Sequence, residues 1–333
     1  MTSARADDGK RYVARPADPS EIRPQTDAYF GRTDGHVELI LRQSGPNLRA
    51  DFFVDLGMVC THLGGADGSF LALPRELDAY VAGAATGMPL LHPYANRLSA
   101  DEFDAYGAHF DARDTPHDRH GLPIHGTMFD RPFTVEGLSV RDRRAGAITT
   151  AAYAAPELLR AFPFAHTVRL MVFLDGPTLR VTTEVHNDGD RPMPVSFGWH
   201  PFFTLPSRPL ADWVLRLPAC RRHVLDDRLL PTGETVDQPE DRSPIGDRTY
   251  DDHFDLGADR TFEISADART LRVDFDEHYP HAQIYLPGPD ALLTGDFVCI
   301  EPMVANTNAL VTESAPTVRP GEDFAATFSV TVM

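Results

Sequence analysis

Lysine is almost missing from this chain. Lys10 is the only lysine in 333 residues, and arginine supplies the rest of the 31 basic side chains. Schiff-base aldolases, pyridoxal enzymes and P-loop kinases each need a lysine in the active site. Because Lys10 lies in an N-terminal segment without a periodic pattern, the sequence excludes these classes.

Cysteine and long apolar runs are also scarce. The chain has three cysteines, Cys60, Cys220 and Cys299, and no C-x-x-C pair. An odd number of widely separated cysteines indicates buried thiols in a reducing compartment. No apolar stretch is long enough to cross a bilayer, and no signal-peptide core is present. We therefore expect a soluble, cytoplasmic protein.

The charge balance is strongly acidic. The chain has a net charge of −18, with 42% hydrophobic and 24% charged residues. Nucleic acids and anionic membranes need a basic surface, so neither is an expected partner. The hydrophobic fraction is that of an ordinary globular protein. A neutral small molecule is the partner that this composition favours.

Short apolar runs separated by turn residues dominate the chain, and long helical periodicity is missing. The runs predict strands, and turn sequences such as Asp175-Gly176-Pro177 predict hairpins. The predicted strands are His36–Leu41, Leu48–Val54, Arg169–Leu174, Thr178–Val185, Thr261–Ser265, Thr270–Phe275, Ala282–Leu286, Phe297–Ile300 and Phe324–Val332. Many short strands indicate an all-β fold, a large antiparallel β-sandwich.

The remaining segments complete the predicted domain plan. Residues 1–26 read as a flexible leader, and residues 27–333 as a single β-sandwich domain. Glu157–Phe162 is the best candidate for a short helical turn, and Thr235–Arg248 reads as a surface loop. No internal repeat of 20–50 residues is evident.

The sequence lacks the common catalytic and cofactor motifs. His117, His120 and His125 do not have the spacing of a helical zinc pair, so no metal is expected. No G-x-S-x-G and no G-x-G-x-x-G after a strand is present, so acyl transfer and nicotinamide chemistry have no support. We expect no cofactor. Acid and base chemistry on a neutral ligand remains.

Two residues are the best candidates for that chemistry. Glu301 follows the apolar run Phe297–Ile300, which predicts a partly desolvated carboxylate at a strand end with a raised pKa. His200 lies between aromatic residues in Phe197–Phe203, after an apolar run. Each has a simpler interpretation, a salt-bridged surface glutamate and a core histidine bonded to a carbonyl.

Further candidates lie on loops. Asn96 and Arg97 end the segment Pro93-Tyr94-Ala95-Asn96-Arg97, where the guanidinium can bind hydroxyls or a carboxylate, although a solvated arginine is the alternative. His125 precedes Gly126, which permits close approach of a ligand. The residues alone do not show that these groups converge.

These segments resemble motifs of the aldose 1-epimerase family, the galactose mutarotase-like proteins, and occur in the same order. The matching segments are Asn96-Arg97, His125-Gly126, Gly198-Trp199-His200-Pro201-Phe202-Phe203, Leu230-Pro231-Thr232-Gly233-Glu234, Tyr250-Asp251-Asp252-His253-Phe254, Cys299-Ile300-Glu301-Pro302-Met303 and Pro320-Gly321-Glu322. The resemblance implies a galactose mutarotase-like β-sandwich and a monosaccharide substrate. The oligomeric state, monomer or homodimer, stays open.

The resemblance also implies roles for individual residues. Glu301 is expected to take a proton from the C1 hydroxyl while His200 protonates the ring oxygen. Arg97, His125 and an aspartate, Asp251 in preference to Asp252, are expected to hold sugar hydroxyls, and Asn96 belongs to the same binding group. The predicted reaction interconverts the α and β anomers of free hexoses such as galactose or glucose.

Departures from the family pattern leave alternatives open. Phe129 and Phe133 stand where an arginine and a tryptophan are often found, and Phe202 replaces a tyrosine. A hexose-6-phosphate mutarotase would need an arginine cluster, for which Arg97 and Arg131 are the candidates. A non-catalytic sugar-binding or regulatory protein on the same fold is the third possibility.

Overall fold

The computed structural model describes residues 26–44, 47–72, 77–141, 144–288 and 295–333. Residues 1–25 of the predicted leader lie outside the described residues. Within the described part, strands pair antiparallel in three larger sheets and two small two-stranded ones, which confirms the all-β prediction.

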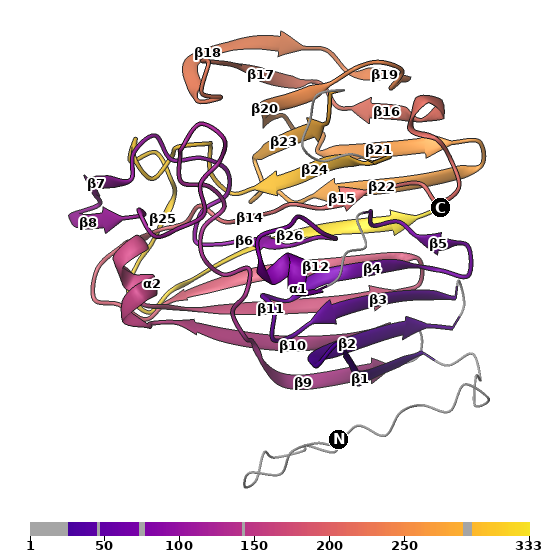
Figure 1. Cartoon of the computed structure of the whole chain (residues 1–333), viewed down its shortest axis with the longest axis horizontal. Helices are drawn as coiled ribbons and strands as arrows, with labels where there is room; N and C mark the ends of the chain where they lie inside the picture. Colours follow the sequence, from indigo (N-terminus) through magenta and orange to yellow (C-terminus); the bar gives the residue numbers. More distant parts are fainter. Residues whose placement is uncertain (1–25, 45–46, 73–76, 142–143, 289–294) are drawn as a thin grey trace, which may run out of the picture.

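One layer of the sandwich is a nine-stranded sheet (Figure 1). In spatial order its strands are β19 (Asp241–Pro244), β16 (Val214–Leu217), β21 (Thr261–Ala266), β22 (Arg269–Phe275), β26 (Asp323–Val332), β12 (Thr178–Asn187), β11 (His166–Asp175), β10 (Arg144–Tyr153) and β9 (Thr134–Arg141). The C-terminal strand β26 therefore lies at the middle of the sheet.

Two further sheets form the opposing layer. The five-stranded sheet runs β1 (Asp27–Thr33), β2 (His36–Gln43), β3 (Leu48–Phe53), β4 (Val59–Gly65) and β5 (Gly68–Ser69). The eight-stranded sheet runs β18 (Pro231–Gln238), β17 (Cys220–Leu225), β20 (Tyr250–Leu256), β23 (His281–Leu286), β24 (Val298–Met303), β14 (Gly198–Trp199) and β6 (Leu90–Leu91), and β15 (Phe202–Phe203) also pairs with β24. Strands β1 and β2 pack over β9, β10 and β11.

The two small sheets and the helices lie outside these layers. The small sheets are β7 (Glu102–Ala105) with β8 (Ala108–Asp111), and β13 (Met193–Pro194) with β25 (Thr317–Val318). The helices of the described residues are α1 (Leu77–Val81), α2 (Pro156–Ala161) and a 3₁₀ turn at Leu210–Asp212. Helix α2 confirms the predicted helical turn, and its Pro156 suits a first helical position, where no N–H bond is needed.

Strict alternation of buried and exposed side chains explains the long strands. In β12 every second residue from Leu179 to Val185 is buried, and β11 has the same pattern. This alternation is expected when one face of a sheet packs on a core. The two strands pair from Asp175↔Thr178 onward, so the hairpin predicted at Asp175-Gly176-Pro177 is confirmed.

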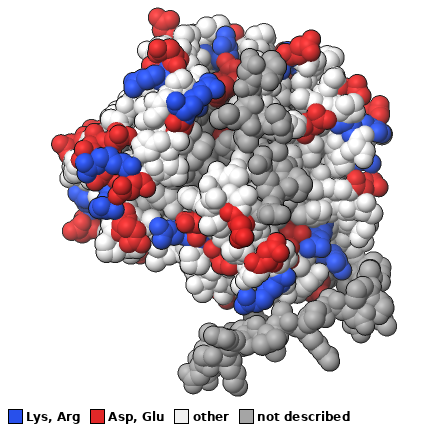
Figure 2. All heavy atoms as spheres, in the orientation of Figure 1, with Lys and Arg blue, Asp and Glu red and all other residues white. Residues whose placement is uncertain are grey.

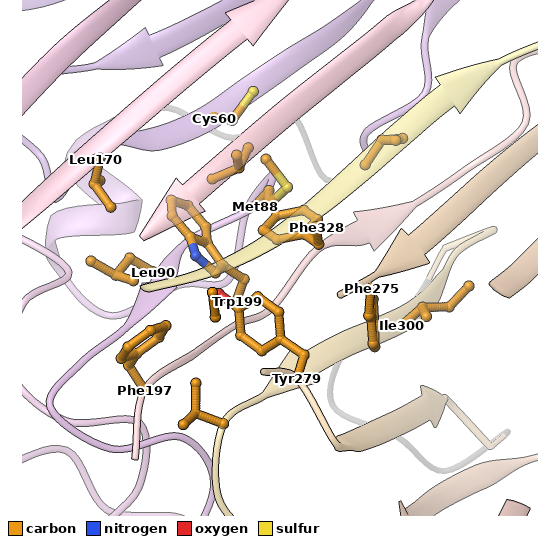
Figure 3. Close-up of a cluster of buried hydrophobic side chains, with 14 of the residues drawn as sticks. Cys60, Met88, Leu90, Leu170, Phe197, Trp199, Phe275, Tyr279, Ile300 and Phe328 are labelled. Carbon is orange, nitrogen blue, oxygen red and sulfur yellow. The ribbon is translucent and has the colours of Figure 1, made fainter. Parts of the chain in front are cut away.

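Aromatic side chains join the layers. Trp199, on β14 of the eight-stranded sheet, packs against Phe328 of β26, with the ring centroids 5.8 Å apart. Its indole N–H donates to Thr183 of β12 at 2.9 Å, so the polar atom of this fully buried ring is paired. Figure 3 shows Trp199 between Phe328, Met88 and Tyr279. This packing fixes the chain immediately before His200.

Two sequence predictions need correction. Thr235–Arg248 is not a surface loop, because β18 pairs with β17 and β19 pairs with β16. Leu230-Pro231-Thr232-Gly233-Glu234, which the family resemblance implies to be a loop, likewise enters β18 and is not a loop alone. Both strands lie at sheet edges and carry polar, largely exposed side chains, so they lack the apolar alternation that identifies a half-buried strand.

The surface agrees with the acidic composition. On the face shown in Figure 2, acidic side chains are scattered among basic and uncharged ones. No helix among the described residues is long and apolar enough to span a membrane. The three cysteines are buried and free.

Candidate active site

An interruption in one strand sets the geometry of the site. Strands β14 and β15 both pair with β24, through Gly198↔Met303 and Phe202↔Cys299, and His200-Pro201 lies between them. The two pairings share one register, in which His200 falls opposite Glu301. Opposite residues in an antiparallel pair project to the same face. The strand pairing therefore brings these two side chains together.

The imidazole of His200 reaches the carboxylate. His200 Nε2 lies 3.3 Å from Glu301 Oε1, and the side chains are 14% and 2% exposed. The ring of Phe202 stacks on His200 with centroids 4.5 Å apart, and its backbone pairing with Cys299 holds it there. The prediction that Glu301 ends its strand is wrong, because β24 continues to Met303. Pro302, which has no N–H to donate, lies next to the interruption.

Burial shifts the pKa values of the pair in opposite directions. Burial raises the pKa of Glu301 well above its ordinary value, and nearby Asp251 adds to the effect while Arg97 opposes it. Burial lowers the pKa of His200 to about 4. Both shifts disfavour the charged forms. Between these two pKa values the pair holds a single proton, which Glu301 carries while His200 is neutral, and transfer of that proton to His200 turns the carboxylate into a base.

His125 approaches His200 from a second loop. The two rings meet edge to face with centroids 5.2 Å apart. The backbone N–H of Asn96 points at His125 Nδ1, at 3.3 Å, so Nδ1 accepts and Nε2 of the neutral ring carries the proton. Burial, with His200 and Arg97 nearby, lowers the pKa of His125 well below its ordinary value. His125 therefore presents a neutral N–H donor.

Backbone geometry explains the His125-Gly126 sequence. Both residues have positive φ, 64° and 73°, in the left-handed region that favours glycine. A Cβ on Gly126 would clash with the carbonyl oxygen of His92. The same carbonyl accepts the N–H of Thr127 at 2.8 Å. Gly126 thus permits the close approach of two loops that places His125 in the site.

Arg97 is held in place by a buried ion pair. Its Nε donates to Asp118 Oδ2 at 2.6 Å, and its Nη2 lies 3.9 Å from Asp251 Oδ2. Asn96 Oδ1 accepts from Arg97 Nη1 at 3.1 Å. The Arg97 side chain is 11% exposed, so the interpretation as a freely solvated arginine is wrong.

Gln283 connects the strand residues with the loop. Its Nε2 donates to Asp251 Oδ1 at 2.8 Å, and its Oε1 accepts from Asn96 Nδ2 at 3.1 Å. Gln283 also pairs in register with Glu301 across β23 and β24. Asp251 is 29% exposed on its side chain, and burial raises its pKa. Its neighbour Asp252 bonds Arg222 Nη1 instead, at 3.1 Å.

These groups surround a cleft of about 280 Å³. Its lining comprises Asn96, Arg97, Asp118, Arg119, Ile124, His125, His200, Asp251, Gln283, Tyr285 and Glu301. A second, mainly apolar cavity of about 310 Å³ shares His125, His200 and Ile124 with it and extends to Tyr80 and Phe129. The volume and mixed polarity suit a small ring with hydroxyl groups.

All six residues predicted from the sequence line this one cleft. Sequence analysis missed Gln283, Asp118, Arg119 and Tyr285. Gln283 is a polar residue within an apolar strand, and this feature of the sequence could have identified it. Arg131, nominated for a phosphate, instead lies 3.5 Å from both Asp130 and Glu157, whereas exposed Arg119 lines the cleft.

Solved structures share this fold at low sequence identity. A galactose mutarotase-like protein from Clostridium acetobutylicum is 18% identical, covers 93% of this chain and 99% of its own, and has a TM-score of 0.82. Galactose 1-epimerase from Lactobacillus acidophilus NCFM is 16% identical, with 92% and 99% covered and a TM-score of 0.76. An aldose epimerase homologue from C. elegans is 14% identical, with 92% and 99% covered and a TM-score of 0.72.

The fold of this chain is therefore that of a galactose mutarotase-like β-sandwich. Residues 60–331 match the sequence family described as aldose 1-epimerase. The chain belongs to the aldose 1-epimerase family.

Proposed function

We propose that this protein interconverts the α and β anomers of free hexoses such as galactose or glucose. The observation that carries the proposal is the buried pair of His200 and Glu301, 3.3 Å apart in one cleft with hydroxyl-binding groups. A base and an acid acting on one hemiacetal are what ring opening requires.

In the proposed reaction the single proton of the pair first passes from Glu301 to His200 across their 3.3 Å contact, and the Glu301 carboxylate then takes the proton of the C1 hydroxyl. The C1–O1 bond becomes a carbonyl, the bond from C1 to the ring oxygen breaks, and its electron pair goes to the ring oxygen. His200 supplies the proton to that oxygen. Rotation about C1–C2 presents the other carbonyl face, and the same transfers in reverse close the ring. The protons balance, since each group recovers its starting form on closure.

The other cleft residues hold the sugar in this proposal. Arg97 offers donors aimed by Asp118, His125 offers its Nε2 N–H, and Asp251 accepts from hydroxyls. Asn96 and Gln283 fix these groups through their amides. A ring bound between them leaves its C1 edge for His200 and Glu301.

Polarimetry tests the proposal. Wild-type protein is expected to accelerate the equilibration of α-galactose and α-glucose, and Glu301→Gln or His200→Asn to lose about 100-fold or more of the rate. Glu277→Gln and His278→Asn, which change exposed side chains, are the matched controls. Wild-type rates in both site variants, with folding intact, would contradict the assignment.

A sugar phosphate is the second candidate substrate, and Arg119 at the cleft favours it. Arginine suits a phosphate because its fork matches the oxygens. A free hexose stays the first choice, since the net charge of −18 opposes a dianionic ligand. Comparing kcat/KM for glucose and glucose 6-phosphate separates the two.

A further inference from the structure

A second cluster of ligating side chains lies on the same sheet face as Glu301. His253 and Asp255 on β20 are two residues apart, which places both on one face of the strand. Asp255 pairs with His281 of β23, and His253 pairs with Gln283. In the register of β17 with β20, His223 falls opposite His253. Three neighbouring strands thus contribute three histidines and one aspartate to one patch.

Two histidines of this cluster bond the carboxylate. Asp255 Oδ1 lies 2.8 Å from His223 Nε2 and 2.8 Å from His281 Nδ1. Asp255 is thus held in place from both neighbouring strands.

His253 lies between them on the middle strand, β20. It is 1% exposed, and neither of its ring nitrogens makes a hydrogen bond of normal length and angle, although Gln283 lies close to it. The buried Nδ1 of His223 also lacks one. The amide of Gln283, on the adjacent strand, is already bonded to Asp251 and Asn96. The His253 ring therefore lies among other possible ligand atoms in a position open to an additional partner.

We propose that His223, His253 and Asp255 bind one divalent transition-metal ion, with Zn²⁺ or Co²⁺ as the fitting chemistry. Two imidazoles and one carboxylate are ligands of zinc sites that keep a further position for water, whereas Ca²⁺ and Mg²⁺ prefer oxygen alone. One ligand atom from each residue lies within 4.8 Å of the others. Bonds of about 2.1 Å hold ligand atoms roughly 3.4 Å apart, so binding an ion needs only small side-chain adjustments.

His281 has a supporting role in this site. It bonds the carboxylate that would ligate the ion, and such partners orient metal ligands. The Asp255 side chain is 34% exposed and the His281 side chain 20%, so an ion can enter from solvent on that side. A bound ion would link β17 and β20 directly and β23 through His281. Its ligand His253 lies two residues after Asp251 on β20.

The catalytic candidates form a second group whose possible ligand atoms also lie within 4.8 Å of one another, namely His200, Cys299 and Glu301. There the histidine and the carboxylate already face each other at 3.3 Å. This group also contains a thiol, Cys299, which the group at His253 lacks. The two groups make different predictions for a cobalt spectrum.

The experiment uses full-length, tag-free protein stripped with a chelator. Titration with Zn²⁺ is expected to give one equivalent of binding and a raised melting temperature. Co²⁺ is expected to give visible d–d absorption without a thiolate charge-transfer band. His253→Ala and His223→Ala should each weaken binding by about 100-fold or more. Exposed His278→Ala and buried Cys299→Ser should bind as wild type does.

Two results would overturn the proposal. One is the lack of saturable Zn²⁺ binding in the wild type. The other is binding that survives in His253→Ala and disappears in Cys299→Ser, with a thiolate band for Co²⁺. If a histidine variant does not fold, anomalous diffraction from zinc-soaked wild-type crystals decides, since a peak beside His253 supports the site and a peak only beside Glu301 contradicts it.

Discussion

Asp118 and Arg97 form a buried ion pair with 2.6 Å between Oδ2 and Nε. The Asp118 carboxylate also accepts the backbone N–H groups of His120 and Leu122 at 2.8 and 3.0 Å. Burial raises the pKa of Asp118, but Arg97 and these N–H groups outweigh it and leave that pKa below its ordinary value. One carboxylate thus shapes the loop and aims the guanidinium.

Asp118→Asn should weaken sugar binding more than it slows turnover. The amide keeps one acceptor for the loop but loses the charge that orients Arg97. Hydrogen bonds to charged groups contribute about 1.5–3 kcal/mol, so KM should rise roughly 10-fold or more with a smaller change in kcat. Steady-state polarimetry measures the changes in KM and kcat separately, with Asp114→Asn, which changes an exposed aspartate, as the control. An unchanged KM would mean that Asp118 only shapes the loop.

The pH profile should be a broad bell. As pH falls through about 4, His200 gains a proton and the pair, now doubly protonated, has no base. As pH rises through the raised pKa of Glu301, the pair loses its last proton and has no acid. We expect kcat/KM to be flat across neutral pH after subtraction of the spontaneous rate. An acid limb centred near pH 6.5, the ordinary value for histidine, would contradict the assigned environment of His200.

Glu301→Gln should change the pH dependence of stability. Because the folded-state pKa of Glu301 lies above its ordinary value of 4.5, folding is most favourable below that value. The stabilisation is lost as pH rises toward the folded pKa, with a limiting slope of about 1.4 kcal/mol per pH unit. The Glu301→Gln variant has no titrating carboxyl at this position and does not lose stability in this way. In urea unfolding at pH 5 to 8, the free energy of unfolding of the variant relative to that of the wild type should therefore increase with pH. A difference that stays constant with pH would refute the raised pKa of Glu301.

Arginine variants distinguish the two substrate classes. If a sugar phosphate is bound, Arg119→Ala should lower kcat/KM for glucose 6-phosphate, while Arg131→Ala, whose side chain is not part of the cleft lining, should not. If a free hexose is the substrate, both variants should turn over glucose at nearly the wild-type rate. Repeating the assay at higher ionic strength tests whether charge is the cause, since salt screens exposed groups.

Sequence patterns predicted the strands that bury one of their two faces in the core. The hairpin of β11 and β12 is visible because every second side chain enters the core. Edge strands β18 and β19 are exposed and polar, so their pairing has no signature in the residues. The resemblance located His200 and Glu301, but only the shared register of β14, β15 and β24 explains why they meet.

Sequence patterns could not predict the cross-strand clusters, because strand pairing leaves no signature in the residues. His223, His253 and His281 are far apart along the chain and adjacent only through strand pairing. Spacing rules examine neighbours in sequence, and they directed attention to His117 and His120 instead. Gln283 interrupts an apolar strand, which is a visible signal, but its partners, Asp251 and Asn96, come from a strand and a loop that the sequence does not connect.

The placement of Glu301 on β24 has an evolutionary consequence. Every residue of this strand is buried, and strands pair with it on both sides, so its position tolerates little change. Arg97, Arg119 and His125 lie on connecting segments, where substitutions and insertions are accepted more readily. Descendants of this chain can therefore change the cleft lining through the loops while the strand position of Glu301 opposite His200 is inherited unchanged.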